Sequence, residues 1–137
     1  MLRAVFDTVV FVRAHIYPSN WAGQLVFERA GRYHLLVSAP LMAEYLDVLY
    51  RSSLRAKHPS INDISVERVI RIVGAAEVVT IDALPHFARD PKDAPVLATA
   101  TAGRADYIVS EDHDLLDLHT YEGIPIVGAG AFLALLG

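Results

Sequence analysis

The chain has 137 residues, enough for one domain with a buried core, and we expect a single domain over residues 1–137. Its 53 % hydrophobic and 20 % charged residues are typical of a globular protein, and no window approaches the roughly 18 apolar residues of a membrane span. The net charge of −4 argues against a general polyanion binder, and the lack of cysteine excludes disulfides and thiolate metal sites. We therefore expect a cytoplasmic protein with no signal peptide and no contact with a membrane.

Apolar segments and amphipathic segments alternate along the chain. Residues 3–12 are rich in β-branched and aromatic side chains and predict a buried strand that runs into a loop. Further strands are expected at 35–38, 77–81, 106–110 and 124–127, helices at 20–30, 40–50, 65–76, 93–102 and 129–136, and irregular structure at 51–61. This alternation predicts an α/β fold with a mostly parallel sheet of roughly five strands and helices on both faces.

Two acids directly follow apolar strand segments. Asp7 comes after the first segment, and Asp112 comes shortly after the fourth. In parallel sheets, ligands bind at the carboxyl ends of the strands, where the strand order reverses. If the first and fourth strands are neighbours there, the two carboxylates meet, and Thr8 is placed to hydrogen-bond one of its acidic neighbours. The alternative is that Asp7 is a turn residue that caps the next segment.

Glu44 lies on or beside the apolar face of an expected helix. Leu41, Tyr45 and Val48 have the spacing of a face that packs on a core, and Glu44 is three residues after Leu41 and four before Val48. An acid that faces inward is seldom fully buried unless it is paired. Glu44 is therefore either a site residue or a border glutamate that reaches water or pairs with an arginine.

Asp93 stands where a helix begins. Asp90 and Pro91 are one possible cap and first position, but a helix that starts at Asp93 keeps Pro95 safely within the first turn. A structural role as a cap explains one of the two acids and not both. We favour Asp93 as the site residue because it heads the apolar side of the helix.

Acids are concentrated after the fourth strand. Residues 106–122 contain six acids and no lysine or arginine. A loop of that charge is unfavourable without a counter-ion, although single acids are also favoured at helix N-termini. We assign Asp112 to the site, Asp114 as an additional carboxylate, and Ser110 as a group that orients a ligand or an attacking water.

Together these acids predict a site for Mg²⁺ or Mn²⁺. Clustered carboxylates need a compensating charge, and hard oxygen ligands suit these two cations. A divalent cation in such a site activates water against a phosphodiester. The predicted ligands are Asp7, Glu44, Asp93, Asp112 and Asp114.

A basic segment lies elsewhere in the chain. Residues 49–75 hold five basic side chains, among them Arg51, Arg55 and Lys57. These three are predicted to guide a phosphodiester substrate toward the acidic site, because they offset the repulsion between phosphates and carboxylates. The alternative is an ordinary solvated surface.

The order and spacing of these residues resemble the PIN-domain nucleases over nearly the whole chain, and most closely the small bacterial single-domain toxins of toxin–antitoxin pairs (VapC-like). Two positions depart from the family pattern, because Val9 stands where Asn is usual and Glu111 where a small residue is usual. The blocks that carry the resemblance are Asp7-Thr8, Glu44, Arg89-Asp90-Pro91-Lys92-Asp93 and Ser110-Glu111-Asp112-His113-Asp114-Leu115-Leu116.

The resemblance implies a PIN-like three-layer sandwich and a metal-dependent endoribonuclease. By motif position, the family's acidic quartet corresponds to Asp7, Glu44, Asp93 and Asp112, with Asp114 as the frequent fifth acid. One or two Mg²⁺ or Mn²⁺ ions bind such a site and activate water for in-line attack on a phosphodiester. The resemblance also implies a homodimer and an antitoxin protein that inserts a segment across the active-site groove.

Two other functions are compatible with parts of the pattern. A non-catalytic PIN-like interaction module would bind a partner protein, with Val9 as the mark of a decayed site. A phosphatase or receiver domain would share the α/β fold, but it is disfavoured because no Asp-x-Asp follows the first strand.

Overall fold

The computed structural model describes residues 1–82 and 91–137, so Arg89 and Asp90 lie outside the described residues. The strands are β1 (Arg3–Phe6), β2 (His34–Val37), β3 (Glu77–Val78), β4 (Tyr107–Val109), β5 (Thr120–Tyr121) and β6 (Ile124–Val127). The helices are α1 (Thr8–Ile16), α2 (Trp21–Gly23), the π-helical η1 (Gln24–Glu28), α3 (Ala39–Leu49), α4 (Ser52–Lys57), α5 (Asp63–Gly74), the 3₁₀ turn η2 (Pro91–Asp93), α6 (Ala94–Ala102), α7 (His113–Leu116) and α8 (Ala129–Leu136).

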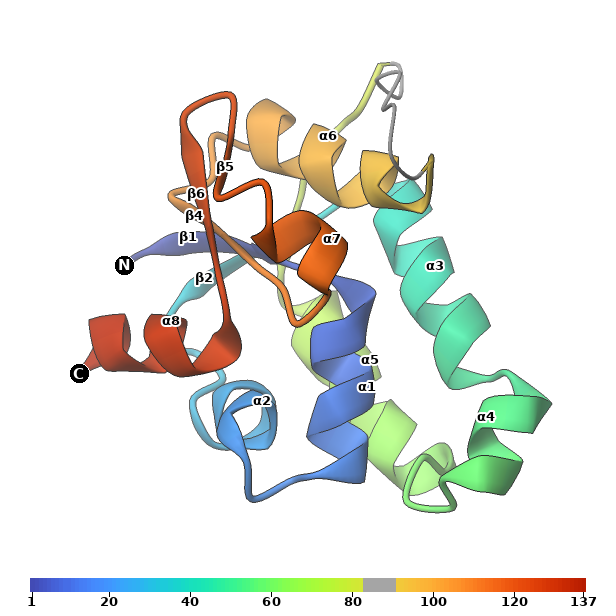
Figure 1. The fold of residues 1–137 in the computed structure, drawn as a ribbon. Helices are drawn as coiled ribbons and strands as arrows, with labels where there is room; N and C mark the ends of the chain where they lie inside the picture. The colour runs from blue at the N-terminus through green and yellow to red at the C-terminus, as the bar shows by residue number, and fades with distance from the viewer. Residues whose placement is uncertain (83–90) are drawn as a thin grey trace.

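The six strands form one sheet in the order β3-β2-β1-β4-β6-β5. All pairs are parallel except β5 with β6. Helix α6 lies on one face of the sheet, and α1, α2 and α8 lie on the other (Figure 1). The prediction of a mostly parallel α/β sheet is confirmed, and the two-residue β5 is the additional strand.

The strand order reverses between β1 and β4. From β1 the chain goes to β2 and β3 on one side, whereas β4 continues to β6 and β5 on the other. In the parallel pairing of β1 with β4, Phe6 lies opposite Val109. The residues that follow these two strands therefore emerge side by side at the carboxyl edge of the sheet.

The core at this edge is aromatic. Phe6, at the end of β1, packs against Phe11, Tyr33 and Phe132, with ring centroids 5.8, 5.1 and 6.3 Å away. All four side chains are buried. Tilted and edge-to-face aromatic pairs of this kind add packing energy to their burial, so they fix the end of β1, where the candidate site begins.

Several segments differ from the prediction: the strand expected at 77–81 ends at Val78, and α7 was not expected. Residues 8–12 belong to α1 and not to the first strand, because Val10, Phe11 and Ala14 are buried at helical spacing. The expected irregular segment 51–61 contains the short helix α4. In the described part of the chain, no helix has the length and apolar character needed to cross a membrane.

Candidate metal centre

Asp7 stands between β1 and α1. Its backbone occupies the N-cap position of α1, but its side chain makes no cap hydrogen bond. The carboxylate is only 7 % exposed and accepts a hydrogen bond from Ser110 Oγ at 2.8 Å. The backbone N–H of Asp7 donates to the carbonyl of Val109 at 2.9 Å. The pairing of β1 with β4 therefore brings Asp7 beside Ser110, a residue 103 positions later in the chain.

Ser110 connects two of the candidate acids. Its buried hydroxyl donates to Asp7 and accepts the backbone N–H of Asp112 at 2.9 Å. Asp112 is the N-cap of α7, and its carboxylate accepts the backbone N–H of Asp114 at 3.2 Å. Asp114 itself is exposed in the first turn of α7. Asp112 thus has a structural role as a cap and also faces Asp7.

Glu44 reaches the same region from α3. Ser38 caps this helix by accepting the backbone N–H of Leu41 at 3.4 Å. Leu41 and Tyr45 are buried, and Glu44 is half-buried at the border of the same face. The hydroxyl of Thr8 donates to Glu44 Oε2 at 2.5 Å. Thr8 therefore orients one carboxylate, as Ser110 orients another.

Asp93 reaches the site from the start of α6. It ends η2, occupies the N-cap position of α6 and is only 4 % exposed. Its side chain makes no cap hydrogen bond. Pro95 lies within the first turn of α6, which is the helix start that favoured Asp93 over Asp90. The short turn η2 places Lys92 next to it.

The four acids line one cavity of about 160 Å³ at the carboxyl edge of the sheet. Around this edge, the starts of α1, α6 and α7 and the body of α3 converge (Figure 1). Asp114 does not line the cavity. Its lining residues are Asp7, Thr8, Val9, Val12, Glu44, Val48, Lys92, Asp93 and Asp112.

The charge of this site is costly to maintain. Burial raises the pKa of Asp7 from its ordinary value of 3.8 to about 6, and the charges of Asp112 and Glu44 act in the same direction. The hydrogen bond from Ser110 opposes the rise because it stabilises the ionised form. Carboxylates that disfavour one another's ionisation in one cavity form a donor set that suits a hard divalent cation.

The side chains do not yet form a complete ligand shell. Within residues 1–82 and 91–137, no three acidic or histidine side chains lie close enough together to form a metal site as they stand. The oxygen donors around the cavity nevertheless have the chemistry that Mg²⁺ and Mn²⁺ prefer. The donor set fits these cations.

Ser110→Ala tests the link between Asp7 and Asp112. The variant removes the hydrogen bond that lowers the pKa of Asp7, so we expect this pKa to rise above about 6. Metal binding in the variant should then require a higher pH and weaken by roughly tenfold to a hundredfold, as for other outer-shell partners. Calorimetric titration with Mn²⁺ at several pH values measures both effects. An unchanged pH profile would contradict this role for Ser110.

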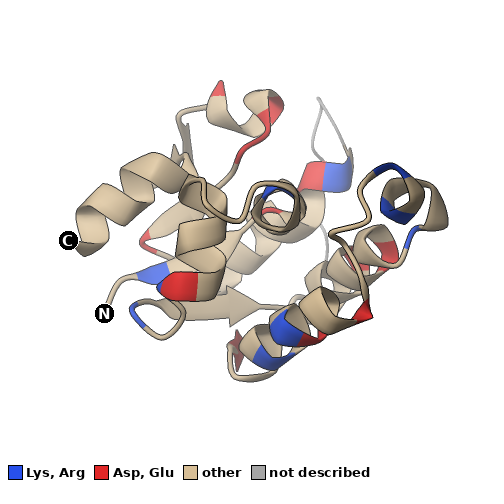
Figure 2. Ribbon diagram, turned by 90° about the horizontal axis from the view of Figure 1, so that it is seen from below, with Lys and Arg blue, Asp and Glu red and all other residues tan. Residues whose placement is uncertain are grey.

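The basic residues proposed for RNA lie apart from the cavity. Arg51 pairs with Asp47 at 2.8 Å, and both side chains are exposed. Arg55 is only 22 % exposed, pairs with Asp63 at 2.7 Å and stacks over Tyr50. Lys57 is exposed at the end of α4. Figure 2 shows basic segments of α4 at the far right of the view. Because Arg51 and Arg55 form ion pairs with acids, only part of the basic charge proposed to guide the substrate is unengaged.

Besides Val9, three lining residues of the cavity were not selected as site residues from the sequence. Val12 lies three residues after Val9 and four after Thr8, and Val48 lies four residues after Glu44, so each follows its neighbour by about one helical turn. Helical spacing from the selected residues was the signal that points to them. Lys92 directly precedes Asp93 in the charged block before α6, so its place beside a selected acid was the signal that could have identified it as a lining residue.

Comparisons with known proteins identify the family and a similar fold. The sequence model of a family described as PIN domain matches residues 3–114. Among solved structures, the crystal structure of PAE2754 from Pyrobaculum aerophilum aligns over 99 % of this chain and 89 % of its own, with a TM-score of 0.57 and 14 % identity. At that identity the likeness concerns the fold alone. No curated protein matches the chain.

Proposed function

Because this chain belongs to the PIN-domain family, whose members are generally nucleases, we propose that it is an endoribonuclease that depends on Mg²⁺ or Mn²⁺. The observation that carries the proposal is the convergence of four acids, far apart in sequence, on one cavity. They are Asp7, Glu44, Asp93 and Asp112. Purely structural roles do not require this convergence, since burying such acids together is unfavourable.

The four acids would hold the metal, with Asp114, whose backbone N–H donates to Asp112, as an additional carboxylate. When bound, the cation supplies a nucleophilic hydroxide and neutralises charge on the leaving oxygen. The residues of the chain orient the donors: Ser110 fixes Asp7, and Thr8 fixes Glu44. Such outer-shell hydrogen bonds hold ligands in place and tune their basicity.

The resemblance to toxins supports the finer part of the proposal. We propose that the protein acts in the cytoplasm as the toxin of a toxin–antitoxin pair and forms a homodimer. A separate antitoxin would block the acidic cavity. Arg51, Arg55 and Lys57 would contact the RNA backbone. Lys57 is the best placed of them because it is exposed and, within the described part of the chain, makes no ion pair within 4.0 Å.

The direct test is cleavage of a single-stranded RNA by the metal-loaded protein. We expect cleavage with Mg²⁺ or Mn²⁺ and none with chelator. Asp112→Asn should cleave at least about 100-fold more slowly, because even outer-shell partners contribute tenfold to a hundredfold. Asp117→Asn is the matched control, since Asp117 is exposed at the other end of α7 and does not line the cavity.

Equal cleavage by the wild type and Asp112→Asn would exclude the acidic cavity as the active site. No metal-dependent cleavage of any RNA by the wild type would favour the interaction module instead.

Neutralising Lys57 should weaken RNA binding and reduce its salt dependence, because one phosphate contact is lost.

A further inference from the structure

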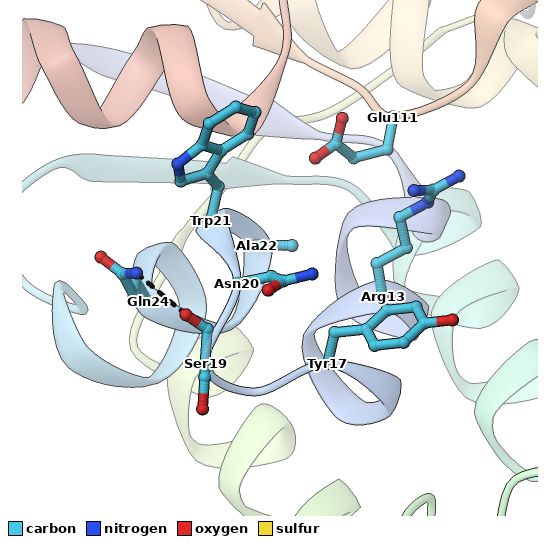
Figure 3. A pocket seen from close by; sticks show the side chains of 8 residues that line it. All are labelled: Arg13, Tyr17, Ser19, Asn20, Trp21, Ala22, Gln24 and Glu111. Atoms are coloured by element: carbon cyan, nitrogen blue, oxygen red, sulfur yellow. Dashed lines mark hydrogen bonds between the residues drawn. The ribbon is translucent and has the colours of Figure 1, made fainter.

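A second, larger cavity lies beside the acidic one. Its volume is about 510 Å³, which is within the range of small-ligand pockets. It opens between the last turn of α1, α2 and the loop after β4 (Figure 3). The lining residues are Arg13, Tyr17, Ser19, Asn20, Trp21, Ala22, Gln24 and Glu111.

This cavity is directly connected in sequence to the acidic site. Glu111 lies between Ser110, which bonds Asp7, and Asp112, which lines the acidic cavity. On α1, Val9 lines the acidic cavity and Arg13 lines the second one, four residues later. Residues four apart in a helix lie on the same face. A strand bound at the acids therefore reaches the second cavity within a short distance.

Two aromatic side chains at the cavity are open to solvent. Trp21 is 64 % exposed and Tyr17 is 54 % exposed. The Trp21 ring lies against Gly130 of α8, because a Cβ atom at Gly130 would come within 2.6 Å of two ring atoms. Helix α8 therefore supports one part of the indole while the rest stays accessible. Exposed aromatic rings of this kind are stacking platforms for unpaired bases.

The cavity also contains a carboxylate beside a guanidinium. Glu111 is half-buried, and the Arg13 side chain extends toward it (Figure 3). The positive charge of Arg13 opposes the rise that burial causes in the pKa of Glu111, so the two groups are within electrostatic reach. Among the described residues, Arg13 makes no ion pair within 4.0 Å. The two groups are therefore neighbours that do not form a salt bridge with each other.

We propose that this second cavity binds an unpaired guanine base of the RNA strand whose phosphate lies at the acidic cavity. Trp21 stacks on the base, Glu111 accepts the N1–H and N2–H₂ donors of guanine, and Arg13 donates to O6. The proposal rests on the ribonuclease function proposed above. It also gives Glu111 a role, at a position where the family pattern has a small residue.

Guanine matches the polar groups of the cavity better than the other bases do. Its pairing edge carries two adjacent N–H donors next to one carbonyl acceptor, which fits a carboxylate beside a guanidinium. Uracil offers one N–H between two acceptors, and adenine and cytosine each offer a single amino group. None of these three bases offers two adjacent N–H donors for the carboxylate of Glu111 together with a neighbouring carbonyl acceptor for Arg13.

The chain contains one tryptophan, so its fluorescence reports directly on this cavity. With metal-free protein in chelator, we expect saturable quenching by guanosine 5′-monophosphate. The adenosine, cytidine and uridine monophosphates should bind roughly tenfold to a hundredfold more weakly, the discrimination expected of a bidentate contact to a base. A uridine tetranucleotide with one guanine should bind more tightly than a uridine tetranucleotide without guanine, because both carry the same phosphates past the acidic cavity. Equal affinity for the two tetranucleotides would overturn the assignment to a guanine of an RNA strand.

Two variants separate the contacts. Glu111→Gln should remove the guanine preference and keep some quenching, whereas Glu122→Gln, at an exposed acid outside the cavity, should change nothing. Gly130→Ala should weaken all four nucleotides equally because it displaces the indole. A guanine preference that survives Glu111→Gln would overturn the proposal. These binding measurements involve neither metal nor cleavage. Guanine binding by a protein without nuclease activity would therefore reject only the proposed ribonuclease function. Nuclease activity without guanine binding would reject only the proposed guanine site.

Discussion

Asp7→Asn is expected to stabilise the metal-free protein by about 3 kcal/mol at neutral and alkaline pH. The folded protein holds the Asp7 proton up to about pH 6, whereas the ordinary pKa of the group is 3.8. The unfolded state therefore loses its proton first, and stability falls as the pH rises from about 4 to about 6. At about 1.4 kcal/mol per pKa unit, the raised pKa corresponds to this 3 kcal/mol.

Asparagine removes the penalty and keeps the local geometry. Its amide oxygen still accepts the hydrogen bond that Ser110 donates to Asp7 in the wild type. Urea unfolding in chelator, at about pH 4 and about pH 8, measures the difference. The two proteins should be equally stable at the lower pH and diverge at the higher one. A variant that is less stable than the wild type at the higher pH would contradict the assigned charge state.

Mn²⁺ is expected to reverse this order of stability. A metal present at about 1,000 times its dissociation constant stabilises the folded state by about 4.1 kcal/mol, which exceeds the difference of about 3 kcal/mol in chelator and corresponds to a rise in melting temperature of roughly 14 °C. The gain should disappear in Asp7→Asn and in Asp93→Asn, since both acids are buried at the cavity. The wild type should therefore be the less stable protein in chelator and the more stable one in metal.

Thermal melts of the chelator-stripped proteins with and without millimolar Mn²⁺ measure this effect. Asp117→Asn keeps all cavity residues, so its metal-dependent shift should equal that of the wild type. If the wild type shows no shift, the acidic cavity does not bind the metal under these conditions and the interaction module becomes the better interpretation. A shift that persists in Asp7→Asn would place the metal elsewhere.

The sequence predicted the sheet and the meeting of the acids because both depend on simple patterns. Apolar strand segments separated by helices define a parallel sheet, and the acids follow strand ends or interrupt a helical face. Asp7 and Asp112 are neighbours because β1 pairs with β4. Whether these acids bind a metal stays a prediction, since that depends on a ligand shell and not on the pattern.

The secondary structure predicted from the sequence was wrong where the local propensity of the residues disagrees with their packing. Val9, Val10 and Val12 favour strands by their β-branched side chains, yet they lie in α1 because that helix buries Val10 and Phe11 against the core. The second cavity was also not predicted. Arg13, Trp21 and Glu111 belong to separate elements, and no periodicity links them.

The two edges of the described sheet restrict how two copies of this protein can associate. Its outer strands, β3 and β5, are only two residues long. Short edge strands offer few unpaired backbone groups, so they are poor templates for joining two sheets into one. A homodimer of this chain is therefore expected to form through side chains on its helices, and the same edges protect it from strand-mediated aggregation.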